Sequence, residues 1–513
     1  MVINIYTAMQ QQLKPLSYET ILTGNLKDII VPEHPAKELP EKVLQFGTGV
    51  LLRALPDYYI DKANRENIFN GRVVVVKSTS KGYSDEFEDQ DHLFTHCMRG
   101  IQNNEPVEKN IINSSISRVL NAQSQWAEVL ACAYDLNIRV IISNTTEMGI
   151  VYVEEKITDK PPVSFPGKLL AFLLNRFLFH GKKEESGLVI LPTELLPGNA
   201  DKLKEILITL AEYNNYSDAF KHWLVDKNTF CNTLVDRIVP GTPEIPVKKE
   251  IEDRLGYTDR LMVMSETYGL WAIEGDEKVK GIITFAGASP EILVTPDISK
   301  YRELKLRLLN CTHSLSCGLS LLAGLKTVRQ SMTDTDISVY IKKVMQEEIA
   351  VSLRPSIAYH EALAYSETVL DRFRNPYINH EWIQVTSNYT SKIKLRLLPV
   401  LKKLYAQNNQ IPKLVAFGFA AYLRFARPVK KINNQYYGEY EQTDYLVNDE
   451  YAEFYSKVWA IGDIHELVNI ILGQTEIWEE DLNRYIGFAD IVAEDIRSIC
   501  KIGIRQTLKN KIS

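Results

Sequence analysis

The chain has few cysteines for its length and no long apolar run. Its six cysteines are scattered over 513 residues, and none belongs to a C-x-x-C pair. This usage is typical of a reducing cytoplasm and argues against a disulfide framework. No run of 18 apolar residues occurs, so we expect no transmembrane helix, and the N-terminus lacks the basic and apolar regions of a signal peptide. These absences predict a cytoplasmic protein with no membrane partner.

An excess of positive charge is also missing. Lysine and arginine number 59 against 65 aspartate and glutamate residues, which gives a net charge of −6 and a pI near 6.0. Proteins that bind nucleic acid are usually basic, so we expect no nucleic-acid partner. The hydrophobic share of 45% and the charged share of 24% are those of a soluble globular protein, and the length fits two or three domains. The sequence leaves the oligomeric state open.

The first half of the chain alternates short apolar runs with helical patterns. The runs predict buried strands at 43–46, 73–76, 138–143 and 188–191, with helices at 50–63, 127–136, 167–179 and 199–213. Such alternation predicts an α/β domain with a mostly parallel, doubly wound sheet of the Rossmann type. After Pro296 the pattern predicts a mainly helical second half, with no strand assigned in it. We therefore expect an N-terminal extension over 1–40, the Rossmann-type domain over 41–290 and the helical domain over 291–513.

A glycine-rich turn follows the first predicted strand. The sequence FGTGVLLR, residues 46–53, leads from a strand through two glycines into a helix. Such a turn exposes backbone N–H groups at the positive end of a helix, where a pyrophosphate can bind, and glycine lets the backbone approach it. The match to G-x-G-x-x-G is incomplete, because Leu52 takes the third glycine position. Arg53 would contact a phosphate or lie on the helix surface, and an ordinary strand-to-helix turn is the alternative interpretation.

Polar residues at the ends of two further predicted strands complete a candidate dinucleotide site. Ser78 follows the second strand, and the segment SNTT, 143–146, follows the third, at the edge where doubly wound sheets bind ligands. The same threonine and asparagine residues would also cap a helix. The candidate cofactor-binding residues are Phe46, Gly47, Thr48, Gly49, Val50, Leu51, Arg53, Ser78, Asn144, Thr145 and Thr146. Lys77 and Lys81 lie where many NAD enzymes have an acidic residue, so the sequence leaves NAD and NADP both open.

Lys305, Asn310 and His313 form the pattern K-x(4)-N-x(2)-H inside a strongly helical stretch. At about 100° per residue, Asn310 lies about 140° and His313 about 80° round from Lys305, so one broad helix face carries all three. An amine, an amide and an imidazole on one face suit proton transfer to and from a hydroxyl or ketone. A solvated lysine, a capping asparagine and a core histidine are the alternative interpretation.

These segments occur in an order that resembles the mannitol dehydrogenase family of polyol-specific long-chain dehydrogenases. The resemblance covers about residues 42–500, and its landmarks are the segments 47–53, 143–147, 235–238, 305–313 and 372–376. Within the family, the segments 192–199, 230–237 and 301–307 most resemble members that act on hexuronates. Glu194 stands where the mannitol enzymes have an asparagine, which argues against mannitol as the substrate.

The resemblance implies a Rossmann-type domain followed by a helical catalytic domain, with NAD as cofactor and no metal. It implies interconversion of D-tagaturonate and D-altronate in hexuronate (galacturonate) catabolism, with fructuronate or mannitol as alternative substrates. Lys305 would be the general acid/base, Asn310 would orient it, and His313 would bind substrate hydroxyls. Glu194 would accept hydrogen bonds from the sugar, although a carboxylate at a helix start is its other interpretation. Arg372 and Arg374 are candidates to pair with the substrate carboxylate, or to form structural ion pairs.

Two rival classes of function are weaker. Cys311, His313 and Cys317 are close in sequence, but Cys311 lies about 160° from His313 on a helix, so the three do not readily share one zinc ion. The helical half could also be a protein-interaction scaffold beside a degenerate nucleotide-binding domain. No repeat period supports a solenoid.

Overall fold

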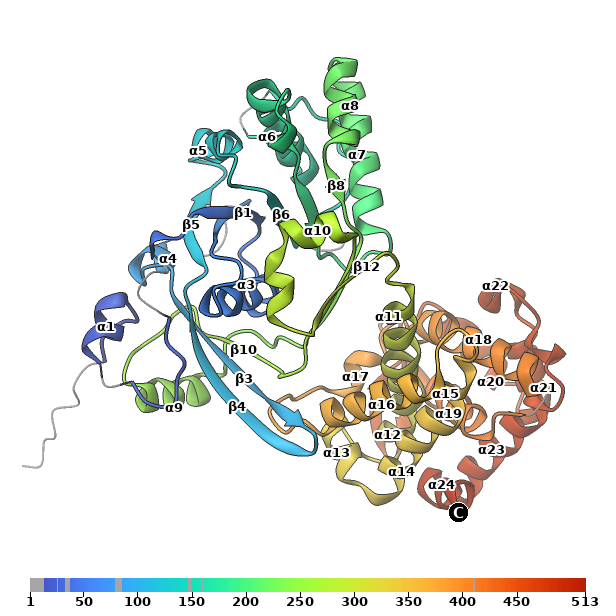
Figure 1. Cartoon of the computed structure of the whole chain (residues 1–513). Helices are drawn as coiled ribbons and strands as arrows, with labels where there is room; N and C mark the ends of the chain where they lie inside the picture. Colours follow the sequence, from blue (N-terminus) through green and yellow to red (C-terminus); the bar gives the residue numbers. More distant parts are fainter. Residues whose placement is uncertain are drawn as a thin grey trace, which may run out of the picture. The chain divides into compact units, whose positions relative to one another are not determined.

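The computed structural model describes residues 13–24, 26–32, 37–78, 85–145, 149–158, 161–408 and 411–513. The chain divides into two compact units (Figure 1). The N-terminal unit comprises Met1–Arg99 and Pro106–Ile298, and the C-terminal unit comprises Gly100–Glu105 and Ser299–Ser513. No helix among the described residues is both long and apolar enough to cross a membrane.

A six-stranded parallel sheet forms the centre of the N-terminal unit, with the strand order β5-β2-β1-β6-β7-β8. Its strands are β1 Glu41–Phe46, β2 Arg72–Lys77, β5 Ile116–Asn121, β6 Val140–Ser143, β7 Val189–Pro192 and β8 Thr229–Phe230. From β1 the chain runs outward to β2 and β5, then returns to β6 on the other side of β1 and continues outward. The predicted doubly wound parallel sheet is therefore confirmed, and the four predicted strands lie in it.

Helices cover both faces of this sheet (Figure 1). One face packs against α3 (Pro56–Arg65), and the other against α6 (Phe165–His180), α7 (Asn199–Tyr213) and α8 (Asp218–Asp226). The helix predicted over 50–63 is divided into α2 (Val50–Ala54) and α3, because Pro56 restricts the preceding Leu55, which has φ −126° and ψ −80°. The helix predicted over 127–136 is α5, Trp126–Ala131, followed by a 3₁₀ turn, Cys132–Tyr134.

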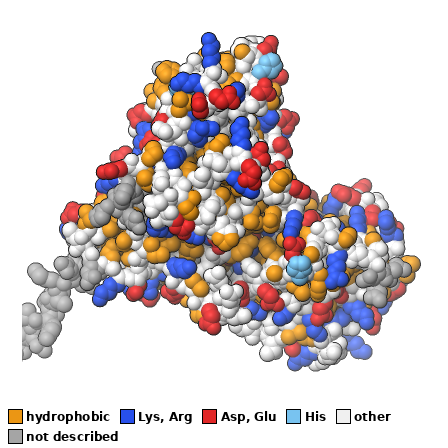
Figure 2. Space-filling view, viewed as in Figure 1, with side chains coloured by type: hydrophobic (Ala, Val, Ile, Leu, Met, Phe, Trp, Pro, Cys, Tyr) orange, Lys and Arg blue, Asp and Glu red, His pale blue; other side chains and the backbone are white. Residues whose placement is uncertain are grey.

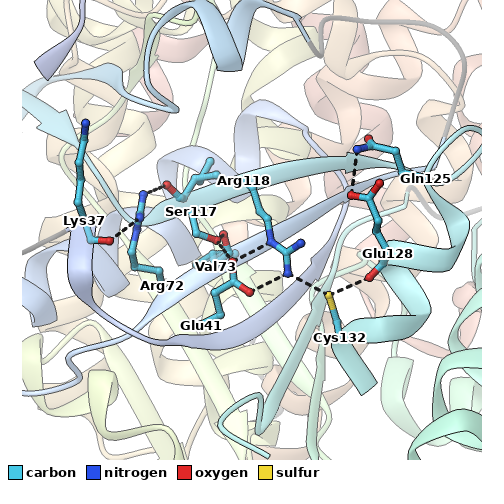
Figure 3. Close-up of polar contacts among 10 residues, drawn as sticks. Lys37, Glu41, Arg72, Val73, Ser117, Arg118, Gln125, Glu128 and Cys132 are labelled. Carbon is cyan, nitrogen blue, oxygen red and sulfur yellow. Dashed lines mark hydrogen bonds and ion pairs between the residues drawn. The ribbon is translucent and has the colours of Figure 1, made fainter. Parts of the chain in front are cut away.

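An ion-pair network joins β1, β2 and β5 near their amino ends (Figure 3). Arg118 of β5 donates from Nε and Nη2 to the two carboxylate oxygens of Glu41 in β1, each at 2.8 Å. Ser117 Oγ donates to Glu41 at 2.8 Å and to the Val73 carbonyl of β2 at 3.0 Å. Burial alone would raise the pKa of Glu41, but these hydrogen bonds hold it below its usual value. A guanidinium fork on one carboxylate fixes the relative position of the two strands.

Smaller elements complete the N-terminal unit. One three-stranded sheet has the order β10-β3-β4, with β3 Phe94–Gln102, β4 Glu105–Asn113 and β10 Val263–Ser265. A second has the order β12-β11-β9, with β9 Thr233–Asp236, β11 Leu270–Glu274 and β12 Ile292–Thr295. Helices α1 (Tyr18–Thr23) and α9 (Ile245–Leu255) pack with β3 and β4 in a separate small core.

The C-terminal unit is mainly helical, as predicted. Its main helices include α11 Ser299–Leu304, α12 Thr312–Leu322, α14 Thr335–Lys343, α16 Tyr359–Arg374, α18 Tyr389–Asn408, α19 Lys413–Phe425, α21 Ile464–Leu472, α23 Phe488–Ile502 and α24 Ile504–Ile512. It also contains an antiparallel sheet that the sequence did not predict, with strands β13 Lys430–Ile432, β14 Gln435–Tyr440 and β15 Thr443–Leu446. Its two tight turns use residue pairs with positive φ, Asn433-Asn434 and Glu441-Gln442. Only the first pair has typical turn residues.

Charged side chains of both signs are interspersed on the face drawn in Figure 2. The described residues form many close pairs of opposite charge, for example Lys402 with Glu480 at 2.7 Å and Arg505 with Asp334 at 2.7 Å. Such a surface differs from the basic stripe of a nucleic-acid binder.

Candidate active site

The glycine turn lies at the carboxyl end of β1, where the winding of the sheet reverses between β1 and β6. Gly47 has φ +124°, and a Cβ there would lie 2.9 Å from Leu52 Cδ1 and 3.1 Å from the Asn144 carbonyl oxygen. Only glycine fits this position without strain. Gly49 precedes α2 with φ −62°, and its Cβ position has no described atom within 4 Å. The turn therefore leaves room in the crevice where doubly wound sheets bind ligands.

The end of β6 lies beside this turn and is held by a hydrogen-bond cluster. Asn144 Nδ2 donates to the carbonyl and hydroxyl oxygens of Thr193 at 3.1 and 3.0 Å. Thr145 donates from its backbone N and its Oγ1 to Glu194 Oε1 at 2.9 and 3.0 Å, and Ser143 Oγ donates to Glu194 Oε2 at 3.1 Å. We call residues 46–53 and 143–145 together the glycine edge.

Glu194 is the buried acceptor of the glycine edge, with 3% of its surface exposed. Burial raises the pKa of this carboxyl, and the hydrogen bonds from Thr145 and Ser143 oppose the rise. A carboxylate offers about four acceptor positions, and the 143–145 segment uses three of them. Glu194 thus has a structural role at the glycine edge, and its predicted contact with the sugar stays a prediction.

The remaining predicted cofactor residues have different surroundings. Ser78 follows β2, and its buried Oγ has no hydrogen-bond partner among the described residues. Thr48, Val50 and Leu51 are half-buried in the turn. Phe46 is buried with its ring centroid 5.2 Å from that of Phe165. Thr146 and Lys81 lie outside the described residues, and Lys77 is buried at the end of β2.

Arg53 lies inside the N-terminal unit, so its alternative position on the helix surface is wrong. Its guanidinium donates to the Leu261 carbonyl and lies 5.5 Å from the ring centroid of Phe94. Burial lowers the pKa of Arg53, while Asp259 and Asp57 act in the opposite direction. Aromatic rings and a backbone carbonyl can hold a weakly hydrated guanidinium in this way. Its contact with a phosphate stays a prediction.

The stretch that carries Lys305 and Asn310 is not a regular α-helix. Helix α11 leads into a π-helical segment, η5 (Lys305–Cys311), which continues into α12. We call residues 299–322 the lysine helix. A π-helix bonds each N–H to the carbonyl five residues earlier, so Asn310 lies roughly one turn above Lys305. The angle of about 140° expected from α geometry is therefore wrong. Both side chains are half-buried.

His313 is almost entirely enclosed by aromatic side chains. Its ring stacks on Phe373 at a centroid distance of 4.3 Å, and it meets His380 and Trp382 edge-on at 5.1 and 5.6 Å. Burial, together with His380, Arg396 and Arg372, lowers the pKa of His313 well below its usual value, so the imidazole is neutral near pH 7. Its buried Nε2 has no hydrogen-bond partner among the described residues. An unpaired buried nitrogen of this kind is costly unless a ligand or water completes it.

The two candidate arginines at the end of α16 differ. Arg372 is 7% exposed, and its charge contributes to the lowered pKa of His313, so it lies near that ring. Arg374 donates from Nη1 to Asp371 Oδ1 at 3.2 Å and to Asn104 Oδ1 at 3.1 Å. Arg374 therefore forms the kind of structural ion pair that the sequence left open.

Cys311 and Cys317 are buried thiols, and burial raises the pKa of each to about 12. Such thiols stay protonated and are poor metal ligands. Among the described residues, no group of three or more His, Cys, Asp or Glu side chains is arranged to hold a metal ion.

Sequence reasoning missed several residues around His313. His380, Trp382 and Arg396 lie around His313 or its helix, and the sequence singles out none of them as a site residue. These residues contact His313 or its helix from 67 or more positions away along the chain. A local sequence pattern cannot reveal contacts over such a separation. The one available signal is that the segment 380–396 contains aromatic and basic residues, which are common around binding sites.

Comparison with known proteins identifies the family. Models of the mannitol dehydrogenase Rossmann domain and the mannitol dehydrogenase C-terminal domain match residues 41–286 and 297–500. Altronate oxidoreductase of Halalkalibacterium halodurans is 37% identical over 489 residues, which cover 94% of this chain and 95% of that protein. Altronate oxidoreductase of Bacillus subtilis is 35% identical over 476 residues, covering 92% and 95%.

Two solved structures share the fold. Pseudomonas fluorescens mannitol 2-dehydrogenase, in a ternary complex with NAD and D-mannitol, aligns with a TM-score of 0.65 at 21% identity, covering 97% of this chain and 99% of that one. Substrate-free D-sorbitol dehydrogenase aligns with a TM-score of 0.78 at 17% identity, covering 97% and 100%. With both family models matched in order over most of its length, this chain belongs to the mannitol dehydrogenase family.

Proposed function

We propose that this protein is an NAD-dependent oxidoreductase that interconverts D-tagaturonate and D-altronate in hexuronate (galacturonate) catabolism in the cytoplasm. The altronate oxidoreductases that resemble it at 33–37% identity over most of the chain support this choice. One structural observation carries it: His313 is buried and its Nε2 has no partner among the described residues, on the helix that also carries Lys305 and Asn310.

The glycine edge fits a dinucleotide. Gly47 permits the tight turn, and the open space beside Gly49 can take a pyrophosphate. The Ser78 hydroxyl, which has no partner among the described residues, can bond a ribose oxygen. Asn144 and Thr145 line the neighbouring strand end. NAD is the proposed coenzyme, and when bound it supplies the hydride that reduces the ketone carbon.

The lysine helix supplies the proton chemistry. Lys305 donates a proton to the ketone oxygen as it becomes an alkoxide, and it accepts that proton in the reverse direction. The π register brings Asn310 next to Lys305, where its amide can donate to the same oxygen and orient the amine. Neutral His313 can both donate to and accept from a sugar hydroxyl. No step requires a metal ion, so activity should survive a strong chelator.

A uronate differs from a neutral ketose by its carboxylate, which needs a cationic partner. Arg372 is the better candidate, because its buried charge lies near His313, the residue proposed to bind the sugar hydroxyls. A guanidinium can bind a carboxylate through two parallel hydrogen bonds.

The test is NADH oxidation measured in parallel with tagaturonate, fructuronate and fructose. We expect kcat/KM to be highest with tagaturonate. A higher value with fructuronate or fructose would replace this proposal by fructuronate reductase or mannitol 2-dehydrogenase activity. Glu194→Asn should move the preference toward the neutral ketose if Glu194 contacts the sugar, and an unchanged preference would leave it only its role at the glycine edge.

A further inference from the structure

The π-helical segment η5 contacts α18 through two arginines, one from each element. Arg396 of α18 donates from Nη1 to the Asn310 carbonyl at 3.3 Å and to Ser314 Oγ at 2.9 Å. Arg307 of η5 donates from Nη1 to the carbonyls of Leu395 and Arg396 at 2.9 and 2.8 Å. Each element thus donates a guanidinium to the backbone of the other. We call this pair of contacts the arginine exchange.

One α18 carbonyl, that of Leu395, needs such a donor because a proline interrupts the helix. Pro399 has no N–H, so the carbonyl of Leu395, four residues earlier, lacks its helical partner. Arg307 supplies the missing hydrogen bond, and Glu303 holds Arg307 in place with contacts at 3.0 and 3.2 Å. Arg307 is 6% exposed, so few other orientations are open to it.

The π register of η5 depends on support from outside the segment. The π-helix is rare and occurs mostly as single turns inside α-helices, often at functional sites. If the segment returned to α geometry, Asn310 would move from roughly one turn above Lys305 to about 140° round the axis. Arg396 holds the Asn310 carbonyl near the end of the π segment, where the helix returns to α geometry at Thr312. The contact therefore lies at the transition from π to α geometry, where a change of helical register would begin.

We propose that Arg307 and Arg396 are positioning residues, which hold η5 in its π register so that Lys305 and Asn310 can act on one substrate oxygen. This inference rests on the proposed function. Both guanidinium groups act through backbone carbonyls of the two helices and not on the substrate. Arg396 has a second effect, since its positive charge helps to keep His313 neutral.

The experiment compares Arg307→Met and Arg396→Met with Arg505→Met in the full-length protein. Arg505 is the matched control, because it donates to the Ala323 carbonyl just beyond the other end of α12 and pairs with Asp334. Amide hydrogen exchange is measured by mass spectrometry over residues 299–322, together with kcat, KM and the Kd of NADH. Arg396→Lys and Arg307→Lys, which keep the charge and one donor, replace the methionine variants if those do not fold.

We expect faster exchange confined to 305–314 and a fall in kcat of about 10²-fold, the size typical of a misplacement near 1 Å. The Kd of NADH should stay within about threefold of wild type. Arg396→Lys should recover at least about tenfold of the lost kcat. Unchanged exchange over 305–314, or an equal loss of kcat in Arg505→Met, would overturn the inference. If wild type fails to reduce tagaturonate, the proposed function fails, but the exchange data still test the arginine exchange.

Discussion

The glycine edge and the lysine helix are built by different kinds of interaction. At the glycine edge, backbone conformation sets the geometry: Gly47 has a positive φ, and a Cβ there would collide with Leu52 and Asn144. In the lysine helix, long side chains from α18 and aromatic rings around His313 set the geometry. The first kind leaves a glycine pattern in the sequence, whereas the second leaves none. The difference teaches that a turn fixed by backbone conformation can be recognised from sequence, whereas the distant side chains that surround a helix face cannot.

Removing the amine of Lys305 is the most severe test of the lysine helix. Lys305→Ala should lower kcat by about 10²–10⁴-fold, the usual contribution of a general acid or base. NADH binds at the glycine edge in our proposal, so its Kd, followed by tryptophan fluorescence, should change less than about threefold. Turnover close to that of wild type would remove Lys305 from the mechanism.

Variants of the two arginines at the end of α16 distinguish a substrate-binding role from a structural one. Arg372→Met should raise the KM for tagaturonate by about 10–10²-fold, because a charged hydrogen bond contributes about 1.5–3 kcal/mol. The KM for fructose, which has no carboxylate, should stay nearly constant. Arg374→Met is the matched control and should change neither KM by more than about threefold. The reverse pattern would assign the carboxylate to Arg374.

The two glycines of the turn should respond differently to alanine. Gly47→Ala forces a side chain into a positive φ and into Leu52, at a cost of about 1–3 kcal/mol, so it should lower Tm and raise the Kd of NADH about tenfold or more. Gly49 has an allowed φ of −62° and open space around its Cβ position. Gly49→Ala should therefore leave the free energy of unfolding unchanged or raise it by about 0.4–1 kcal/mol, and Tm should not fall. Its methyl group should still weaken NADH binding. Unchanged binding in Gly49→Ala would place the coenzyme elsewhere.

Stability should also depend on pH, through a buried carboxyl beside the glycine edge. Asp57 is fully buried, and burial raises its pKa to about 7 although Gln45 donates to it at 3.2 Å. A raised carboxyl pKa contributes stability that is complete below the unfolded value near 4 and is lost as pH rises through about 7. Asp57→Asn lacks this loss, so its Tm relative to wild type should rise between pH 5 and 8. The gain in unfolding free energy should be about 1–3 kcal/mol.

Glu348 in the C-terminal unit is a second buried carboxyl with a raised pKa, and its pH dependence can be compared with that of Asp57. Burial raises the pKa of Glu348 to about 7, against hydrogen bonds from the backbone N–H groups of Leu414 and Val415. Glu348→Gln should therefore shift Tm in the same direction with pH. Its Tm should start from a lower value at pH 5, because its amide NH₂ must face one of those N–H groups. Thermal unfolding at pH 5, 6, 7 and 8 measures both variants, and a Tm difference that falls with pH would contradict the assigned pKa.

Much of the N-terminal unit was predictable because its signals are local. The four valines of β2 are buried on both faces of the sheet, as a continuous apolar run predicts. Helix α7 begins and ends where its pattern does, at Asn199 and Tyr213. The hairpin of 435–446 carries no turn signal, because Glu441 and Gln442, which adopt positive φ there, are not typical turn residues; the hairpin of 430–440 has one in Asn433-Asn434, which the prediction of a mainly helical second half did not use. In the same way Arg53 reads as a surface residue of a helix, yet Phe94 and the Leu261 carbonyl hold it inside.

The sequence by itself determined the parallel sheet, the glycine turn after its first strand and the presence of an amine, an amide and an imidazole in one helical stretch. These depend on hydrophobic periodicity and on steric limits within a few residues. Only the tertiary structure decided the π register of Lys305–Cys311, the neutral state of His313 and the ion pair of Arg374. The physical reason is distance along the chain: the arginine exchange joins residues 82 to 89 positions apart, and burial arises only when such distant segments pack.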